Sequence, residues 1–452
     1  MKRIRIIGAG IAGSEAAWQC ARRGVQVELW EMRPHTMPPA HRTSGFAELV
    51  CSNSFKSKDP HTSAGLLKEE LRMLGSLILD CAEAEALPGG TALMVDRERF
   101  SARVTEAISC NPLIHVIRGS VDNIAEFAAE SGNDPVIVAV GPNTTDNFWR
   151  SLDAFLGSER LHFFDATSPI VSADSLKFDR IFEASRYGKG ENEGYLNSPM
   201  DKDEYVRFRE ELLSAELVPL GHGEELSLFE GCLPIEELAR RGEDAMRFGP
   251  LKPVGFVDPV KGREPYAVVQ LRQEDSMRAA YSLVGFQTRL KFPEQERVLS
   301  LIPGLEKAKF LRHGRMHKNT YIDAPKLLYP TLQYRANPNL LFAGQITGLE
   351  GYQSAAATGL VAGLNAVRIV SGAEPLRIPE KTVIGEALRW MTDFGNKEYR
   401  PTAPVFGMWK DVPKLKKKDR AEWFIRRSRE GIAKIAADIA AKSETEFRYV
   451  DT

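Results

Sequence analysis

Cysteine is scarce in this sequence, and its spacing fits neither a disulfide framework nor a metal site. The 452 residues include five cysteines, an odd number, with no C-x-x-C pair and no histidine pattern beside them. They are Cys20, Cys51, Cys81, Cys110 and Cys232. Disulfide frameworks need paired cysteines, and structural zinc sites need closely spaced ligands. The pattern therefore argues against both, and we expect no metal site.

Long apolar runs and net charge are also missing. No uninterrupted apolar stretch approaches the roughly 18 residues that a membrane-spanning helix needs. The chain starts Met1-Lys2-Arg3-Ile4 and leads into a strand-like segment instead of a cleavable signal. We therefore expect a cytoplasmic protein that does not act in a membrane. The formal net charge is only -1, so any binding to nucleic acid would depend on a local basic surface.

The length of the chain favours two or three domains. Between residues 190 and 310 the sequence pattern changes to short strand-like stretches interrupted by Pro250, Pro253, Pro259 and Pro265. An inserted domain is the simplest interpretation. We predict a first domain over residues 1–190 that resumes over 310–452, with a smaller α+β domain inserted over 191–309.

The first thirty residues predict one βαβ unit with a glycine turn. Residues 4–7 and 25–29 have the pattern of strands, and a helix is predicted between them. Gly8, Gly10 and Gly13 fit the motif G-x-G-x-x-G. The first glycine makes the turn, the second lets the backbone approach a pyrophosphate, and the third lets the helix pack closely on the strand.

An acidic residue completes this unit. Glu31 follows Gly13 by 18 residues and ends the second strand, where a carboxylate accepts hydrogen bonds from ribose hydroxyls. A purely structural turn is the alternative for the glycines, but the strand, helix and carboxylate together favour a nucleotide site. The motif itself fits either FAD or NAD.

Two later segments predict further strands of the same sheet. Residues 135–142 and 339–344 have the pattern of buried strands and reach glycine where such strands meet a ligand. The predicted fold class is therefore α/β, a doubly wound and mostly parallel Rossmann-like sheet. Many flavoproteins hold the flavin end with a C-terminal strand of this kind and the next helix, here predicted over 354–359. That favours FAD, with contacts from Gly344, Gln345, Thr347 and Gly348.

Blocks of sequence beyond the glycine turn resemble one enzyme family. Residues 48–57 contain Val-Cys-Ser-Asn-Ser, and residues 229–236 read Phe-Glu-Gly-Cys-Leu-Pro-Ile-Glu. Further blocks are 65–72, 95–98, 185–187, 195–197, 248–255, 269–273, 285–288, 316–320 and 343–348. These blocks are distributed over most of the chain, from residue 48 to residue 348, and they are similar to the folate- and FAD-dependent tRNA (uracil-5-)-methyltransferase family.

The resemblance implies a reductive methylation. Methylenetetrahydrofolate supplies one carbon, FAD carries it and electrons, NADPH is the reductant, and a uracil in the T-loop of tRNA becomes 5-methyluracil. By motif, Cys232 would add to uracil C6 and Cys51 would help to remove the C5 proton. This chemistry needs a thiolate, since C5 is a poor nucleophile until sulfur adds to C6, and a base must then take the C5 proton. Without the family, a lone cysteine is more often a small buried apolar residue, which stays our interpretation of the other three.

Three more residues of the family-like blocks are candidates for substrate contacts. Lys252 and Arg272 could meet the folate glutamyl tail or an RNA phosphate, although a solvated ion pair is the alternative for each. His317 could hydrogen-bond to flavin or substrate, and a satisfied core histidine is its alternative.

The chain departs from the family pattern at two places. Gln353-Ser354-Ala355-Ala356-Ala357 stands where the family usually has Val-Glu-Ser-Ala-Ala, which removes a carboxylate. Residues 401–407 read Pro-Thr-Ala-Pro-Val-Phe-Gly where Pro-Met-Asn-x-Asn-Phe-Gly is common. Ribosomal RNA or a small molecule is therefore an alternative to tRNA as the methyl acceptor. A flavin oxidoreductase, or an RNA-binding flavoprotein with a structural cofactor, stays open as function.

A basic run lies near the C-terminus. Residues 408–435 contain ten Lys or Arg against four acids, a cluster that can bind RNA phosphates. The alternative is an ordinary solvated helix face, because Phe424, Ser428, Ile432 and Ile435 fall near one side of a predicted helix.

Overall fold

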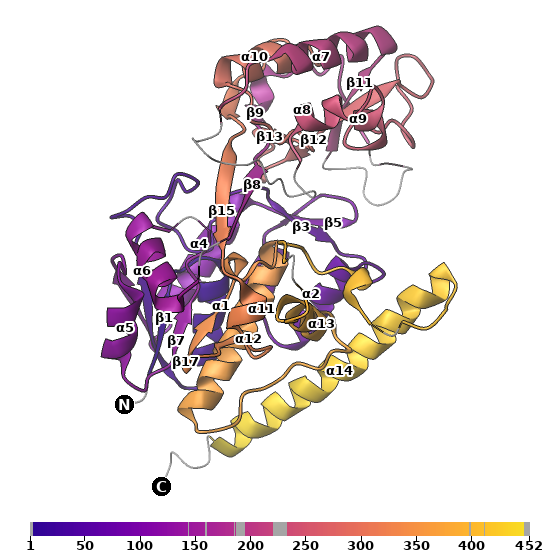
Figure 1. Ribbon diagram of the computed structural model, residues 1–452. Helices are drawn as coiled ribbons and strands as arrows, with labels where there is room; N and C mark the ends of the chain where they lie inside the picture. Colours follow the sequence, from indigo (N-terminus) through magenta and orange to yellow (C-terminus); the bar gives the residue numbers. More distant parts are fainter. Residues whose placement is uncertain are drawn as a thin grey trace.

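The structure is a computed structural model that describes residues 3–142, 144–158, 161–184, 186, 195–219, 233–396, 399–410 and 412–446. Two lobes are joined by a narrow ribbon, and a long C-terminal helix lies along the larger lobe (Figure 1). No helix in these ranges is long and apolar enough to cross a membrane.

The larger lobe is built on a six-stranded sheet with the order β16-β17-β7-β1-β2-β6. Its strands are β1 Arg3–Ile7, β2 Gln26–Glu31, β6 Ile114–Arg118, β7 Val136–Val138, β16 Gln333–Tyr334 and β17 Asn337–Phe342. Neighbours are parallel except for β16 and β17. The prediction of a mostly parallel α/β sheet is confirmed, and so is the prediction that two distant segments join the N-terminal strands.

Glycines let two helices of this lobe pack closely. Helix α1 Ile11–Ala21 follows β1, and α12 Tyr352–Val370 packs against it. A Cβ atom on Gly359 would overlap the backbone of Ala12, and one on Gly363 would lie 2.8 Å from the carbonyl oxygen of Ala16. Further helices of the lobe are α2 Ser63–Met73, α3 Leu77–Ala84, α4 Arg97–Ser109, α5 Ile124–Ser131, α6 Asp146–Leu156, α11 Ala324–Leu327 and α13 Val383–Met391.

The smaller lobe has an antiparallel sheet and its own hydrophobic core. The strand order is β10-β11-β12-β13-β9-β14. The strands are β9 Ile170–Ser172, β10 Phe182–Glu183, β11 Tyr195–Met200, β12 Ala267–Gln273, β13 Ala280–Leu283 and β14 Phe310–Arg312. Helices α7 Lys202–Ser214, α8 Ile235–Arg240, α9 Ala245–Phe248 and α10 Phe292–Leu299 belong to this lobe (Figure 1). Strands β9, β10 and β14 lie outside the segment 191–309, and the domain limits themselves stay a prediction.

The ribbon between the lobes consists of β8 Leu161–Ala166 and β15 Met316–Tyr321 (Figure 1). The two strands are antiparallel, and Asp165 lies directly opposite His317. A small three-stranded sheet, made of β3 Ser54–Ser57, β5 Ala92–Val95 and β4 Ala86–Leu87, completes the larger lobe.

A buried carboxylate fastens the C-terminal helix α14 Lys417–Glu446 to the larger lobe. Phe424, Ser428, Ile432 and Ile435 are all buried, so the predicted packing face of this helix is confirmed. Glu70 on α2 accepts hydrogen bonds from the Ser428 hydroxyl at 2.5 Å and from the backbone N–H groups of Val383 and Ile384 at the start of α13. One side chain thus joins three helices.

Removing this carboxylate tests its contribution. We expect Glu70→Ala to lower the free energy of unfolding by about 3 kcal/mol, because three buried donors lose their acceptor. Glu69→Ala is the matched control, since the neighbouring Glu69 pairs with the largely exposed Arg429 and should contribute at most about 1 kcal/mol. Urea denaturation of both variants measures the difference, and equal losses would contradict the assignment.

Candidate dinucleotide site and the adjoining chamber

A cavity lies at the carboxyl ends of β1, β2, β7 and β17. We call it the strand-end cavity. Its lining includes Gly8 and Gly10 from the turn after β1, Glu31 from β2, Gly141 after β7 and Gly344 after β17. Open parallel sheets bind ligands at this edge, so the sheet topology itself positions the site.

The three motif glycines occupy three different environments. Gly8 has φ +98°, and a Cβ atom there would lie 2.6 Å from the carbonyl oxygen of Ala139. A Cβ atom on Gly13 would overlap the carbonyl oxygen of Gly8, whereas one on Gly10 would meet no atom within 4 Å. Gly10 also precedes α1 without a side-chain cap, so N–H groups of the first turn can bind an anion. The geometry therefore fits the predicted roles: Gly8 makes the turn, Gly10 leaves room for a pyrophosphate, and Gly13 allows close packing of the helix on the strand.

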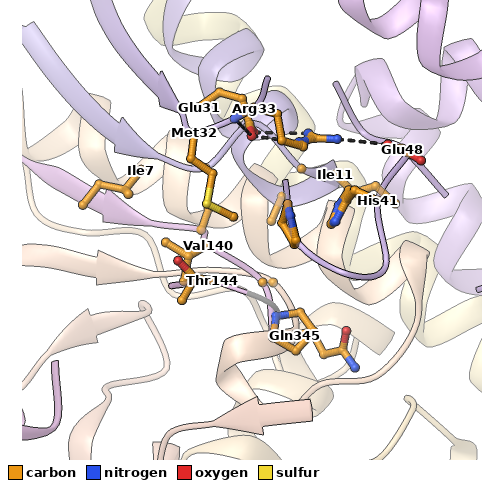
Figure 2. A pocket seen from close by; sticks show the side chains of 18 of the residues that line it. Ile7, Ile11, Glu31, Met32, Arg33, His41, Glu48, Val140, Thr144 and Gln345 are labelled. Carbon is orange, nitrogen blue, oxygen red and sulfur yellow. Dashed lines mark hydrogen bonds and ion pairs between the residues drawn. The ribbon is translucent and has the colours of Figure 1, made fainter. Parts of the chain in front are cut away.

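Glu31 is held in a network of buried charges. Its carboxylate accepts hydrogen bonds from the backbone N–H of Ala9 at 2.9 Å and from three nitrogens of Arg33 at 2.8 to 3.2 Å. Figure 2 shows the Arg33 guanidinium between Glu31 and Glu48, which it contacts at 3.2 Å. Burial raises the pKa of Glu31, but hydrogen bonds and charge from Arg33 outweigh it and leave the pKa below its usual value. A ribose hydroxyl would have to compete with Arg33 for this carboxylate.

His41 supplies an unsatisfied group to the same cavity. Its Nδ1 atom is buried and has no hydrogen-bond partner. Burial, followed by the charge of Arg33, lowers the pKa of His41 to about 4, so the ring is neutral at pH 7. Buried polar atoms usually have partners. This nitrogen, the open face of Gly10 and the carboxylate of Glu31 together fit a bound dinucleotide.

A second cavity adjoins the first. We call it the Cys51 chamber, because Cys51 lines it together with Asp165, His317, Asn319 and Glu350. Both cavities share lining from Val50, Pro142, Gln345, Tyr352 and Ala355. The two spaces are therefore contiguous, and a group at the end of the strand-end cavity faces the chamber.

Two arginines hold the segment that carries Cys51. Arg97 at the start of α4 donates to the carbonyl oxygens of Leu49 and Cys51, and Arg312 on β14 donates to that of Val50 at 2.6 Å. The backbone N–H of Cys51 donates to the Tyr352 hydroxyl at 3.0 Å. Since Arg312 comes from the smaller lobe, Cys51 lies where the two lobes meet.

Cys51 is protonated in this environment. Burial raises the pKa of its thiol to about 12, and the charge of Asp165 acts in the same direction. Arg97, Arg272 and Arg312 oppose this shift without overcoming it. The sulfur can accept a proton only after another group has taken the one it carries.

The predicted cofactor residues lie at or behind the cavity walls. Gly8, Gly10, Glu31, Gly344 and Gln345 line the strand-end cavity. Gln345 also donates to both oxygens of Glu350, at 2.9 and 3.2 Å. Thr347 is buried behind the wall, and its carbonyl oxygen accepts a hydrogen bond from the Tyr399 hydroxyl. Gly348 has φ +85° and packs on the ring of Tyr399. Contact with a cofactor stays a prediction for all of them.

The predicted substrate residues are more scattered. His317 lines the Cys51 chamber, and burial, then the charges of Arg312 and Arg315, lowers its pKa to about 4. Arg272 on β12 lies close enough to affect Cys51, and its Nε atom is buried without a partner. Lys252 is exposed and belongs to the lining of neither cavity. Cys232 lies outside the described residues.

The two departures from the family pattern both reach the Cys51 chamber, whose lining includes Gln353, Ala403 and Pro404. The Gln353 amide donates to the carbonyl oxygen of Phe55. Although a carboxylate is missing at position 354, Glu350 and Asp165 supply carboxyl groups to the same chamber.

Several residues of the site carried no signal in the sequence. Arg33, Asp165 and Arg312 lie in no motif or family-like block, and only the register and packing bring them to the cavities. Arg97 lies in the family-like block 95–98, but that block assigned it no role. Glu350 had a weak signal, because it lies between Gly348 and Gly351 in a glycine-rich segment after a predicted strand.

An open parallel sheet with a glycine turn and a buried acid at its carboxyl edge defines a dinucleotide-binding α/β protein. A model of the glucose inhibited division protein A family matches residues 3–374. The chain belongs to this family, within which its curated relatives carry the name TrmFO.

Individual relatives support the assignment. The chain is 52% identical over 406 residues to methylenetetrahydrofolate–tRNA-(uracil-5-)-methyltransferase TrmFO of Moorella thermoacetica, covering 90% of this chain and 91% of that protein. It is 48% identical over 438 residues to TrmFO of Bacillus subtilis, covering 96% and 99%. The solved structure of GidA from Aquifex aeolicus superposes with a TM-score of 0.71 at 17% identity, covering 100% of this chain and 76% of that one. The family resemblance predicted from the motifs is confirmed.

Proposed function

We propose that this protein is a methylenetetrahydrofolate–tRNA-(uracil-5-)-methyltransferase that binds FAD and uses NADPH as reductant. The relatives that match nearly the whole chain carry the first part of that name. FAD and NADPH are the cofactors that the family resemblance implies. An enzyme that modifies tRNA works in the cytoplasm, where we expect this protein.

The observation that carries the proposal is that the two cavities adjoin and share lining residues. A dinucleotide along the strand ends would have its reactive ring near Gln345 and Tyr352, which line both spaces. Cys51 lines the space beyond them. A carrier of one carbon and a thiol that acts on uracil must reach the same atom, and contiguous cavities allow this.

Individual residues have the following roles in this proposal. Gly8 and Gly10 would admit the pyrophosphate to the start of α1, and Glu31 would meet the ribose. The bound flavin supplies the carrier for the methyl carbon and the electrons that reduce it. Cys232 adds to uracil C6 and makes C5 nucleophilic, and Cys51 removes the C5 proton after the new carbon bond has formed.

RNA contact would come from side chains near the chamber and from basic side chains on the smaller lobe and the C-terminal helix. Arg272 and His317 adjoin the chamber, and Lys252 stands exposed on the smaller lobe. On α14, Arg420 and Arg426 are exposed to solvent. Contacts with phosphates make affinity fall with salt.

A labelled transfer assay tests the function. Reduced enzyme is incubated with methylenetetrahydrofolate labelled in its transferable carbon and with unmodified tRNA, and in parallel with unmodified ribosomal RNA. We expect label in 5-methyluracil of the T-loop of tRNA and none in ribosomal RNA, with turnover that requires NADPH. Label in ribosomal RNA alone would change the acceptor, and no label in either RNA beside an active relative would reject the proposal.

A further inference from the structure

The Cys51 chamber holds three acidic groups from three separate elements. Cys51 precedes β3, Asp165 lies on β8 and Glu350 precedes α12, and all three line the chamber. The Cys51 and Asp165 side chains are half-buried, while Glu350 is buried. A chamber of this composition can hold and exchange protons.

Asp165 is aimed at the chamber by the register of the ribbon. It lies directly opposite His317 in the antiparallel pair of β8 and β15, so the two side chains share a face with Cβ atoms about 4.5 to 5.5 Å apart. Asn319 is two residues further along β15 and therefore on the same face. All three residues line the chamber, and a hydrogen bond with the Asn319 side chain lowers the pKa of Asp165 in opposition to burial.

The three groups differ in their affinity for protons. Burial raises the pKa of Asp165 to about 6. Burial and then the charge of Asp165 raise the pKa of Glu350 to about 8 and that of Cys51 to about 12. At pH 7 the Asp165 carboxylate is therefore the ionised member, and the other two carry protons. His317 is neutral, but its pKa of about 4 makes it a weaker acceptor than Asp165.

Transfer within this group keeps the net charge of the chamber constant. If Cys51 lost its proton to solvent while Asp165 stayed charged, two like charges would share the chamber. If the proton moves from the sulfur to Asp165, the chamber holds one negative charge before and after the step. Arg97, Arg272 and Arg312 face the Cys51 side and stabilise the charge there.

We propose that Asp165 is the proton acceptor that makes Cys51 a base. This inference rests on the proposed methyl transfer. The S–H bond of Cys51 breaks and an O–H bond forms on Asp165 as the sulfur takes the proton from uracil C5, so no free thiolate has to accumulate. The electron pair left on C5 forms the double bond to the new carbon, whose bond to its carrier breaks.

The other charged or titratable groups around Asp165 do not replace it in this step. Glu350 already carries a proton at pH 7, and its remaining contacts are the two hydrogen bonds from Gln345. Tyr352 has a pKa raised by burial and then by Cys51, and its oxygen accepts the N–H of Cys51. Lys56 on β3 is a cation that acts on Glu350.

The experiment uses tRNA with tritium at C5 of uridine, so that release of tritium to water reports loss of the C5 proton. We expect Asp165→Asn to keep its flavin and to form the covalent complex with tRNA through Cys232, but to release tritium at least about 100-fold more slowly. In the wild type, release should fall as the pH is lowered through about 6, because the protonated carboxyl no longer accepts. We call this fall at low pH the acid limb of the pH profile. The release rate of Asp165→Asn should show no acid limb.

Asp165→Glu provides a second, conservative variant, in which a carboxyl group remains and we expect part of the release rate and an acid limb. Asp174→Asn is the matched control, since Asp174 is exposed on the smaller lobe and should leave release unchanged. Wild-type release and an unchanged acid limb in Asp165→Asn would overturn the proposal, as would a flavin-loaded Asp165→Glu without an acid limb. Failure of the methyltransferase function itself is distinct, because the wild type would then transfer no label to tRNA.

Discussion

Gly13→Ala should yield a destabilised protein that does not retain flavin. A Cβ atom at this position would overlap the carbonyl oxygen of Gly8, and the obstacle is backbone that cannot rotate away. Helix α1 would have to move off β1, which displaces the N–H groups that the proposed pyrophosphate site needs. We expect a loss of about 3 kcal/mol or more in the free energy of unfolding, measured by urea denaturation, and a colourless purified protein.

Gly10→Ala is the matched control for this prediction. A Cβ atom on Gly10 meets no protein atom within 4 Å and projects into the strand-end cavity. The free energy of unfolding without cofactor should therefore change by less than about 1 kcal/mol. FAD affinity should fall at least about tenfold, equivalent to roughly 1.4 kcal/mol. Normal FAD binding by both variants would refute the assignment of the cradle.

Cys232→Ala and Cys51→Ala should both abolish methyl transfer, but at different stages. Without the Cys232 thiol no sulfur adds to C6, so we expect transfer to fall on the order of 10⁴-fold or more, with no covalent complex with tRNA. Without the Cys51 thiol the complex should still form, but release of the C5 proton should slow at least about 100-fold. Gel mobility of the enzyme with labelled tRNA separates the two stages.

Cys110→Ala is the control for both cysteine variants. The interpretation of Cys110 as a small buried residue is wrong, because it is an exposed free cysteine at the end of α4. The control variant should keep transfer and complex formation. All three variants should retain flavin. Neither Cys51 nor Cys110 lines the strand-end cavity, and the proposed role of Cys232 is addition to uracil. Full transfer by Cys232→Ala would favour a flavin oxidoreductase that does not use this residue.

The position of Cys51 between the lobes has a mechanical consequence. Its segment is held by Arg97 from the larger lobe and by Arg312 from the smaller one. Asn53 adds a second connection, because its amide donates to the carbonyl oxygens of Val95 and Gln273, one in each lobe. A shift of the smaller lobe relative to the larger one would therefore move the thiol relative to the strand-end cavity.

The sequence by itself determined the parts of this protein whose signals are local. The strand, glycine turn, helix and second strand that end at Glu31 follow from periodicity and from the steric needs of glycine over a short stretch of chain. Contiguous blocks of residues indicated the family and identified Cys51 and Cys232 as candidate catalytic residues. The buried strand patterns at 135–142 and 339–344 were likewise sufficient to assign two more strands to the same parallel sheet.

Only the tertiary structure decided which residues share the chamber with Cys51. Asp165 faces it because β8 pairs with a strand far away in the chain, and a shift of one residue in that register would turn the carboxyl group to the other face. Glu350 acquires a high pKa only through burial beside Asp165. Arg312, on strand β14 of the smaller lobe, donates to the backbone next to Cys51 only because the two lobes pack together there. Such contacts depend on the packing of segments distant in sequence, and no local pattern of residue types encodes them.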